Sequence, residues 1–512
     1  MTPMMDARRH LWFRVLVVLG LFYVAAFLIC AGARLLYPYE VDYTESALVS
    51  VLARMARGEP IYAPPGLHFT SMVYTPLNFH VASLLDRLHP GGYIGLRLTS
   101  ILSTLWTALV IICVARRHKA PLWATMVALG VFFGAYTRTA LAQDHAHVDA
   151  LALAFSLTAM AVVFEARKTL AMAVLAGVIA GLGIVTKQTM VVFVAMPAVW
   201  MLLHGQKTRA VVFAVAALTT AVGLLAYWGH LRNPWFYFWV FKLESGAHIR
   251  ARRMLVEAPL YMLLCLPAGL LVGVLAKLGS ATADPEKRPF WVRWPSAWWA
   301  DPWAVNLLGF AGLAAIARAK DGGGYNVFLP LFAMAAIQLA RHAPAWVERR
   351  PRATLALLVL QLLVLVYIPS LFVPMRRDRE VVDKVIAQIR NIPGEVYVPA
   401  YPEYAVRAGK SWWVHYTLVC GLAQFDTSLR NALGDEIRAQ HFAAIIPHAD
   451  VEPKDVGLCD LPDLEKYYMP GEAVEMPPGP SLSDILTGHP SAAGIAHGGK
   501  LARIWVPRPQ NP

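Results

Sequence analysis

The feature that most constrains this chain is a series of apolar stretches, each about as long as a helix that crosses a bilayer. Such a helix needs roughly 20 mostly apolar residues, and stretches of this kind recur between residues 11 and 374. The chain is 57% hydrophobic and only 15% charged, which is too apolar for an ordinary soluble domain. The sequence therefore predicts a polytopic α-helical membrane protein.

Short basic loops between these stretches indicate how the spans are oriented, because Lys and Arg gather on the cytoplasmic side. The rule gives about eleven spans, with the N-terminus in the cytoplasm and the C-terminus outside. The predicted spans are 11–33, 97–115, 120–141, one from 149 to the basic pair at 167–168, two within 170–203, 210–229, 258–276, 301–317, one that ends at Arg341, and 354–374. The net charge of +13 follows from these loops and does not indicate nucleic acid.

One loop departs from this charge rule. Residues 230–257 are placed outside, yet they carry Arg232, Lys242, Arg250, Arg252 and Arg253. Either a span is misplaced, or the loop keeps a basic surface for an anionic ligand. We favour the second interpretation because the other loops alternate correctly, and Arg252 and Arg253 then become candidates for binding a lipid phosphate.

The composition becomes ordinary after residue 375, which predicts two domains. Residues 1–375 form the transmembrane domain, and residues 376–512 form a small extracytoplasmic α/β domain. Periodicity in the second domain predicts helices at 381–389 and 429–440 and strands at 396–398, 442–446 and 503–506. Residues 474–500 are expected to form a loosely ordered excursion, and Cys420 and Cys459 are candidates for a disulfide in an oxidising compartment.

Three carboxylates follow the first span: Glu40, Asp42 and Glu45. Acids at a membrane boundary are costly and indicate a function. Asp42 followed by Glu45 also fits a capping box for the next helix, whose apolar face, 47–55, is expected to lie along the membrane surface. The two interpretations of Asp42 are compatible.

Further polar residues reach the same outer boundary under this topology. They are Asp144, His147, Asp149, Lys187, Gln188, Lys320, Tyr325 and Asn326. Simpler interpretations remain open, because an acid in the first turn of a helix complements the helix dipole and a lysine at a span end snorkels to water. The Gly322–Gly324 run reads as a flexible turn. Their shared side of the membrane favours a site at this boundary.

These residues resemble the GT-C glycosyltransferases, in particular the bacterial protein-mannosyltransferase and aminoarabinose-transferase branch, which use lipid-linked sugar donors. The resemblance covers the transmembrane domain. It depends on the motifs Asp42-Tyr43-Thr44-Glu45, Gly58 to Tyr62, Tyr74-Thr75-Pro76-Leu77, Ala146-His147-Val148-Asp149-Ala150-Leu151, Thr186-Lys187-Gln188 and Tyr325-Asn326-Val327-Phe328-Leu329-Pro330.

The resemblance implies roles for individual residues. Asp42 is the expected catalytic base, with Glu45 or Glu40 as neighbours, although the family's common adjacent Asp-Glu pair is absent. Asp149, or else Asp144, is the second acid of the site. Lys187, Arg252 and Arg253 are expected to bind the donor phosphate. His147, Gln188, Lys320, Tyr325 and Asn326 are expected to contact substrate.

The resemblance also implies a reaction. A sugar would move from a polyprenyl-phosphate donor to a hydroxyl of a glycan, lipid or protein acceptor, with inversion, at the outer face of a bacterial inner membrane and among membrane lipids. Some members of the superfamily use a divalent cation such as Mg²⁺ or Mn²⁺, and the sequence does not decide this. Two other classes stay open, an O-antigen-type polymerase or ligase and a transporter or flippase of lipid-linked sugars. A transporter would favour repeated halves and broken helices, which the sequence does not show.

Overall fold

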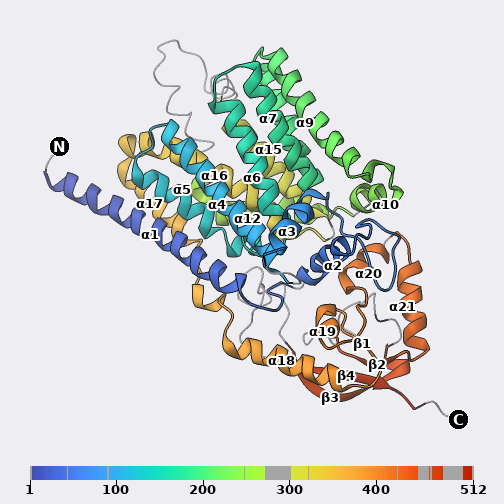
Figure 1. Cartoon of the computed structure of the whole chain (residues 1–512). Helices are drawn as coiled ribbons and strands as arrows, with labels where there is room; N and C mark the ends of the chain where they lie inside the picture. The colour runs from blue at the N-terminus through green and yellow to red at the C-terminus, as the bar shows by residue number, and fades with distance from the viewer. Residues whose placement is uncertain are drawn as a thin grey trace.

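A computed structural model shows a bundle of apolar helices followed by a smaller α/β unit (Figure 1). It describes residues 3–42, 44–88, 92–246, 248–270, 301–320, 322–423, 425–447, 461, 464–476 and 500–509. The main helices of the bundle are α1 (Pro3–Leu35), α4 (Ile94–Arg117), α5 (Leu122–Gly134), α6 (Asp149–Glu165), α7 (Leu170–Thr186), α8 (Val192–Leu203), α9 (Lys207–Tyr227), α12 (Ala258–Cys265), α15 (Pro302–Ala319), α16 (Leu329–Arg349) and α17 (Pro351–Leu363).

Several of these helices can cross a membrane. Among the described residues, five stretches are long and apolar enough: His10–Leu35, Ile94–Arg117, Lys207–Tyr227, Pro302–Ala319 and Tyr325–Arg349. Four shorter apolar helices, α5, α7, η2 (Gln188–Val191) with α8, and α17, occupy other predicted spans. A multi-pass membrane protein is thus confirmed, whereas the count of eleven stays a prediction. Of the predicted span 258–276, residues 271–276 lie outside the described residues.

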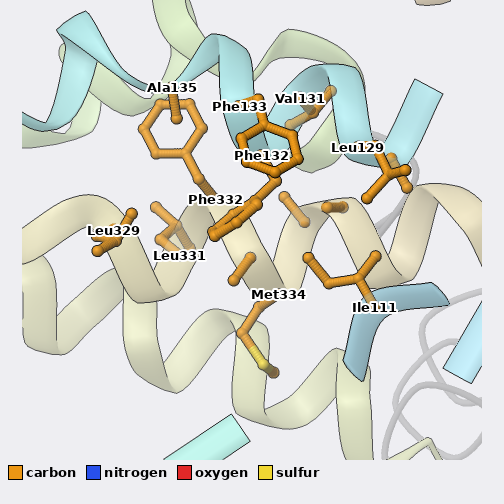
Figure 2. Packing of buried hydrophobic residues seen from close by; sticks show 14 of the residues in the cluster. Ile111, Leu129, Val131, Phe132, Phe133, Ala135, Leu329, Leu331, Phe332 and Met334 are labelled. Atoms are coloured by element: carbon orange, nitrogen blue, oxygen red, sulfur yellow. The ribbon is translucent and has the colours of Figure 1, made fainter. Parts of the chain in front are cut away.

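The core of the bundle forms where α5 packs against α16 (Figure 2). Phe132 and Phe133 of α5 and Phe332 of α16 are at most 2% exposed. Gly130 of α5 allows close packing, since a Cβ there would lie 2.8 Å from Leu362. This packing holds the start of α16, and with it the turn that precedes α16.

Short helices connect the bundle on the side of the C-terminal unit. They are α2 (Glu45–Ala56), α3 (Leu77–Asp86), η1 (Thr137–Thr139), η3 (His230–Arg232), α10 (Pro234–Tyr237), η4 (Phe238–Lys242), α11 (Leu243–Ser245), η5 (Arg253–Glu257), η7 (Tyr325–Phe328) and η8 (Pro369–Leu371). The apolar face of α2 is buried in one cluster with Trp413 and Phe442. The expectation that this face lies along the membrane surface is therefore wrong, because the face is buried inside the protein.

The C-terminal unit contains a four-stranded sheet of order β1-β2-β4-β3. β1 and β2 are parallel, and the other neighbours are antiparallel. Its elements are α18 (Arg376–Asn391), β1 (Glu395–Tyr397), α19 (Pro402–Arg407), α20 (Tyr416–Ala423), α21 (Ser428–Arg438), β2 (Phe442–Ile445), α22 (Leu464–Tyr467), β3 (Tyr468–Met476) and β4 (Lys500–Pro507). The domain boundary at residue 375 stays a prediction.

The predicted elements of this unit correspond to α18, β1, α21, β2 and β4. β3 was not predicted, and its end enters the stretch expected to be loosely ordered, because Val474 and Met476 pair with Ala502 and Lys500. Residues 477–499 and Cys459 lie outside the described residues. The Cys420–Cys459 disulfide therefore stays a prediction.

Candidate active site

A buried ion pair organises the loop that follows α1. Nη2 of Arg97 lies 2.6 Å from Oε2 of Glu45, and Nε donates to Oε1 at 3.1 Å. Both side chains have no solvent exposure. Arg97 also donates to the carbonyl oxygens of Arg34, Tyr37 and Tyr39. One guanidinium of α4 therefore fixes the path of the chain from the end of α1 to the start of α2.

Glu45 also joins this loop to the segment before α6. Its carboxylate accepts hydrogen bonds from the backbone N–H groups of Val41 at 2.9 Å and Ala146 at 2.8 Å. Burial raises the pKa of Glu45, but the charge of Arg97 and these hydrogen bonds outweigh burial and leave the pKa below its usual range. Glu45 is therefore a structural carboxylate with its oxygens engaged, which corrects its expected place beside the reacting atoms. Glu45 thereby joins Val41 to Ala146, which directly precede the predicted site residues Asp42 and His147.

Asp42 has a partly exposed side chain in this fixed loop. Its Oδ1 accepts a hydrogen bond from the backbone N–H of Thr44 at 2.9 Å and another from the Thr44 hydroxyl. α2 begins at Glu45, with Thr44 as its N-cap residue. The capping box is therefore wrong in detail, because Asp42 stabilises the turn before the helix. Tyr43 lies outside the described residues.

Glu40 is buried where the loop meets the C-terminal unit, with 5% exposure. Neither carboxyl oxygen has a hydrogen-bond partner among the described residues. Burial raises the pKa of Glu40 well above its usual range, and the nearby carboxylates of Glu45 and Glu403 raise it further. Glu40 is therefore enclosed, with a pKa raised by burial, and its expected place as a neighbour of the base stays a prediction.

Asp144 is also enclosed. Its Oδ2 lies 3.0 Å from Nε of Arg34 and accepts a hydrogen bond from the Tyr136 hydroxyl at 2.6 Å. The side chains of Asp144 and Arg34 have no exposure. This pair ties α1 to the segment before α6. Of the two candidates for the second acid, the geometry therefore favours Asp149.

Asp149 borders a cavity of about 280 Å³. The polar part of its lining includes Tyr74, Asp149, Lys187, Gln188, Lys320 and Asn326. The apolar part includes Met190, Phe193, Phe310, Leu313, Ala317 and Val327, from η2, α8, α15 and η7. Five predicted site residues thus meet in one cavity. Asp42 is not among the residues that line it.

The polar part is organised around the Asp149 carboxylate, at the first residue of α6. Nζ of Lys187 lies 2.7 Å from Oδ1, and Nδ2 of Asn326 donates to Oδ2 at 2.9 Å. Nδ1 of His147 lies against the same Oδ2, and Nε2 of His147 lies 2.9 Å from the hydroxyl oxygen of Tyr74. Asp149 therefore positions Lys187 at the cavity, and the snorkelling interpretation of this lysine is not needed.

The glycine run between α15 and η7 also lines the cavity. Gly322 has a φ of +83°, and a Cβ on Gly323 would lie 2.3 Å from the Ala317 carbonyl oxygen. The Gly323 carbonyl oxygen accepts a hydrogen bond from Arg318 at 2.9 Å. The run is therefore a constrained turn that needs glycine, whereas the sequence favoured a flexible one. Asp321 lies outside the described residues.

The basic loop 230–257 packs against residues 34–96, the segment between the first two predicted spans, which we call the first outer loop. Asn233 donates to the Tyr62 carbonyl oxygen at 2.9 Å, and the Trp239 indole donates to that of Ala63 at 2.8 Å. Ile249 forms an antiparallel bridge with Lys320 at the cavity turn. These contacts fit the placement of the loop beside the first outer loop.

Besides His147 and the acids other than Asp149, three expected site residues do not line the cavity. The Arg252 side chain is 86% exposed and paired with Glu257, and Arg253 also does not line the cavity. Tyr325 is buried beside Tyr261, with Arg318 over its ring. The geometry therefore does not favour the expected phosphate and substrate contacts of these residues.

Sequence reasoning missed the parts played by Arg97 and Tyr74. Arg97 is a single charge inside an apolar stretch, and that signal could have identified it. Among the described residues, no three His, Cys, Asp or Glu side chains gather as a metal site. A divalent cation stays an expectation of the resemblance.

Comparison with known proteins identifies a matching family model and solved structures with a similar fold. Residues 74–232 match the family model described as dolichyl-phosphate-mannose-protein mannosyltransferase, whereas no curated protein matches the chain. The fold is similar to that of ArnT from Cupriavidus metallidurans in the apo state, with a TM-score of 0.54 and 15% identity, over 84% of this chain and 93% of that chain. Together they confirm the resemblance to GT-C glycosyltransferases.

Two further solved structures have lower scores. ArnT from Cupriavidus metallidurans bound to undecaprenyl phosphate has a TM-score of 0.46 and 16% identity, over 91% of this chain and 87% of that one. The Archaeoglobus fulgidus oligosaccharyltransferase tethered with an acceptor peptide has a TM-score of 0.47 and 11% identity, over 88% and 72%.

Proposed function

We propose that this protein is a membrane glycosyltransferase that moves a sugar from a polyprenyl-phosphate donor to an acceptor hydroxyl at the outer face of the membrane. The observation that carries the proposal is the cavity beside Asp149, which joins a charged end to an apolar wall. A polyprenyl phosphate has the same two parts. The mannosyltransferase family model over residues 74–232 supports the reaction class.

The apolar wall suits the lipid part of the donor. Phe193, Phe310 and Leu313 line it. Ile316, which also lines the cavity, is an apolar side chain with 43% exposure. A prenyl chain in the surrounding lipid can therefore reach the cavity without passing through water, and its burial there is favourable.

The charged end suits the phosphate. An ammonium group has three N–H donors, so Lys187 can bind Asp149 and a phosphate oxygen together. Lys320 also lines the cavity, in the turn bridged to Ile249. Fixed positive charge at the point where negative charge develops stabilises a departing phosphate. Lys187 keeps its expected role, and Lys320 takes the place of Arg252 and Arg253 in this part of the proposal.

Asp42 stays our candidate for the base. Its carboxylate takes the proton of the acceptor hydroxyl while that oxygen forms a bond to the anomeric carbon. The bond from this carbon to the phosphate oxygen breaks, and its electron pair stays on the phosphate. Attack from the opposite side inverts the configuration. The Glu45 contacts to Val41 and Ala146 hold Asp42 close to the Asp149 segment.

The acceptor side is proposed to face the C-terminal unit, which packs on the first outer loop. The Val414 N–H donates to the Leu67 carbonyl oxygen at 2.8 Å, and His68 contacts the Trp412 carbonyl oxygen at 3.0 Å. A glycan, lipid or protein that reaches Asp42 must pass this unit. We assign the protein to the inner membrane of a bacterium, with this unit in the periplasm.

A transfer assay tests the proposal. The purified protein is incubated with labelled sugars on polyprenyl phosphates and with candidate glycan, lipid and protein acceptors. We expect transfer by wild type and a loss of about 10²–10⁴-fold in Asp42→Asn, because removal of a general base has effects of this size. Asp149→Asn should also lose activity through the misplacement of Lys187. The control is Glu59→Gln, an exposed acid of the same loop that pairs with Arg57.

Two results would contradict parts of the proposal. Undiminished transfer by a folded Asp42→Asn protein would remove Asp42 as the base. Movement of a lipid-linked sugar across vesicle membranes without transfer to any acceptor would favour a flippase.

A further inference from the structure

Tyr74, His147 and Asp149 form a chain of contacts that borders the cavity. Nε2 of His147 lies 2.9 Å from the Tyr74 hydroxyl oxygen, and Nδ1 lies against Oδ2 of Asp149. His147 is 8% exposed, whereas Tyr74 and Asp149 line the cavity. The proposed reaction gives neither Tyr74 nor His147 a part.

The contacts fix where the protons lie. Asp149 binds Lys187 through Oδ1 and accepts from Asn326 through Oδ2. It is therefore a carboxylate, which can only accept, so Nδ1 of His147 carries a proton. Burial lowers the pKa of His147, and Asp149 opposes this only in part. The ring is then neutral, Nε2 accepts the Tyr74 proton, and the Tyr74 oxygen offers only lone pairs to the cavity.

A phosphate in the cavity changes this balance. Its oxygens repel the lone pairs of Tyr74, and its negative charge favours protonation of His147. One proton from solvent on Nε2 makes His147 donate to the Tyr74 oxygen, and the Tyr74 O–H then turns to a phosphate oxygen. No bond between heavy atoms changes.

We propose that His147 is a positioning residue that takes up one proton when a polyprenyl phosphate occupies the cavity, and that this turns the Tyr74 hydroxyl into a hydrogen-bond donor to the phosphate. The inference rests on the proposed function. Sugar transfer leaves a phosphate monoester, which can carry one more negative charge than the donor diester. The added donor therefore appears as that charge develops, where it assists most.

The charged and titratable groups around His147 agree with this behaviour. Asp149 is the first residue of α6, and Lys187 directly follows α7. His145 lies in the same loop as His147, and the centres of the two rings are 5.2 Å apart. Nζ of Lys187 also lies 5.7 Å from the centre of the Tyr74 ring. The positive charge of Lys187 disfavours a proton on His147 while the cavity is empty, and a bound phosphate offsets that charge.

Calorimetry tests the proposal by counting protons. The full-length protein in detergent is titrated with farnesyl phosphate at pH 7.5, in two buffers that differ in ionisation enthalpy. This pH lies above the second pKa of a phosphate monoester, about 6, so the ligand takes up few protons itself. We expect uptake near one proton per ligand in wild type. His147→Gln and Tyr74→Phe should show uptake near zero and about tenfold weaker binding.

The matched control is His145→Gln. Nδ1 of His145 contacts the Leu141 carbonyl oxygen, and this variant should keep the wild-type uptake. Equal uptake in wild type and in a folded His147→Gln protein would overturn the inference and leave the proposed function intact. If His147→Gln does not fold, Tyr74→Phe decides, because it removes one hydroxyl. If farnesyl phosphate does not bind wild type, the proposed function fails and this inference fails with it.

Discussion

Carboxyl groups at the predicted outer boundary differ in ionisation and pairing because their neighbours differ. Glu45 faces a guanidinium and two backbone N–H groups, so it is ionised although fully buried. Asp149 is held by Lys187 and Asn326 at the edge of a cavity. Glu40 has no such partner. Burial costs a charged group much less when opposite charges and donors surround it.

The unpaired Glu40 gives a prediction about pH. Because the pKa of Glu40 is raised in the folded protein, its carboxyl group stays protonated there at pH values where the same group in the unfolded chain has lost its proton. Stability from this group is therefore present at low pH and lost as pH rises. In Glu40→Gln this loss disappears, so the variant should be more stable than wild type at pH 8. The gain in unfolding free energy is up to about 1.4 kcal/mol for each pH unit above the pKa that Glu40 has in the unfolded chain.

Thermal unfolding in detergent between pH 5 and pH 8 checks this prediction. The difference between Glu40→Gln and wild type should shrink toward pH 5. Glu59→Gln, at an exposed site, should follow wild type throughout. A Glu40→Gln protein that loses stability at pH 8 would show that the carboxyl group is ionised and paired.

At the level of elements, helices α7 and α9 pack unusually closely through small residues. A Cβ on Gly177 would lie 2.4 Å from the Phe213 carbonyl oxygen, and one on Gly181 would lie 2.6 Å from that of Ala217. Small residues permit such approaches between membrane helices. The packing matters for the site because Lys187 directly follows α7.

Gly177→Ala should therefore push α7 away from α9 and destabilise the protein by about 1–3 kcal/mol, as overpacking does. Gly223→Ala on α9 is the matched control, since a Cβ there meets nothing within 4 Å. Melting temperatures of the two variants check the prediction. Equal melting temperatures would mean that the helices can separate without cost.

At the scale of the whole molecule, the basic loop 230–257 joins two other segments. These are the first outer loop and the turn at residues 320–324 that lines the cavity. Trp239 binds the first outer loop, and Ile249 bridges to Lys320. The apolar face of α2 shares a buried cluster with residues of the C-terminal unit, which Figure 1 draws next to α2. Positive charge in loop 230–257 is therefore expected outside, against the usual trend.

Labelling of cysteines in intact cells tests this topology. In a background without native cysteines, Arg252→Cys should react with an impermeant maleimide from outside, because that side chain is 86% exposed. Arg117→Cys, at a 61% exposed position at the end of α4, should react only after the membrane is permeabilised. The reverse pattern would contradict the predicted orientation and the outer-face site.

The sequence by itself determined the membrane class, most helix positions and the residues that meet near Asp149. Apolar length, basic loops and short motifs are local properties, so they can be read without the fold. The tertiary structure decided which acids are free to act, because burial and pairing depend on partners far along the chain. Arg97 engages Glu45, Arg34 engages Asp144, and the buried Glu40 lies near the carboxylate of Glu403 in the C-terminal unit. Only the folded protein brings these partners together.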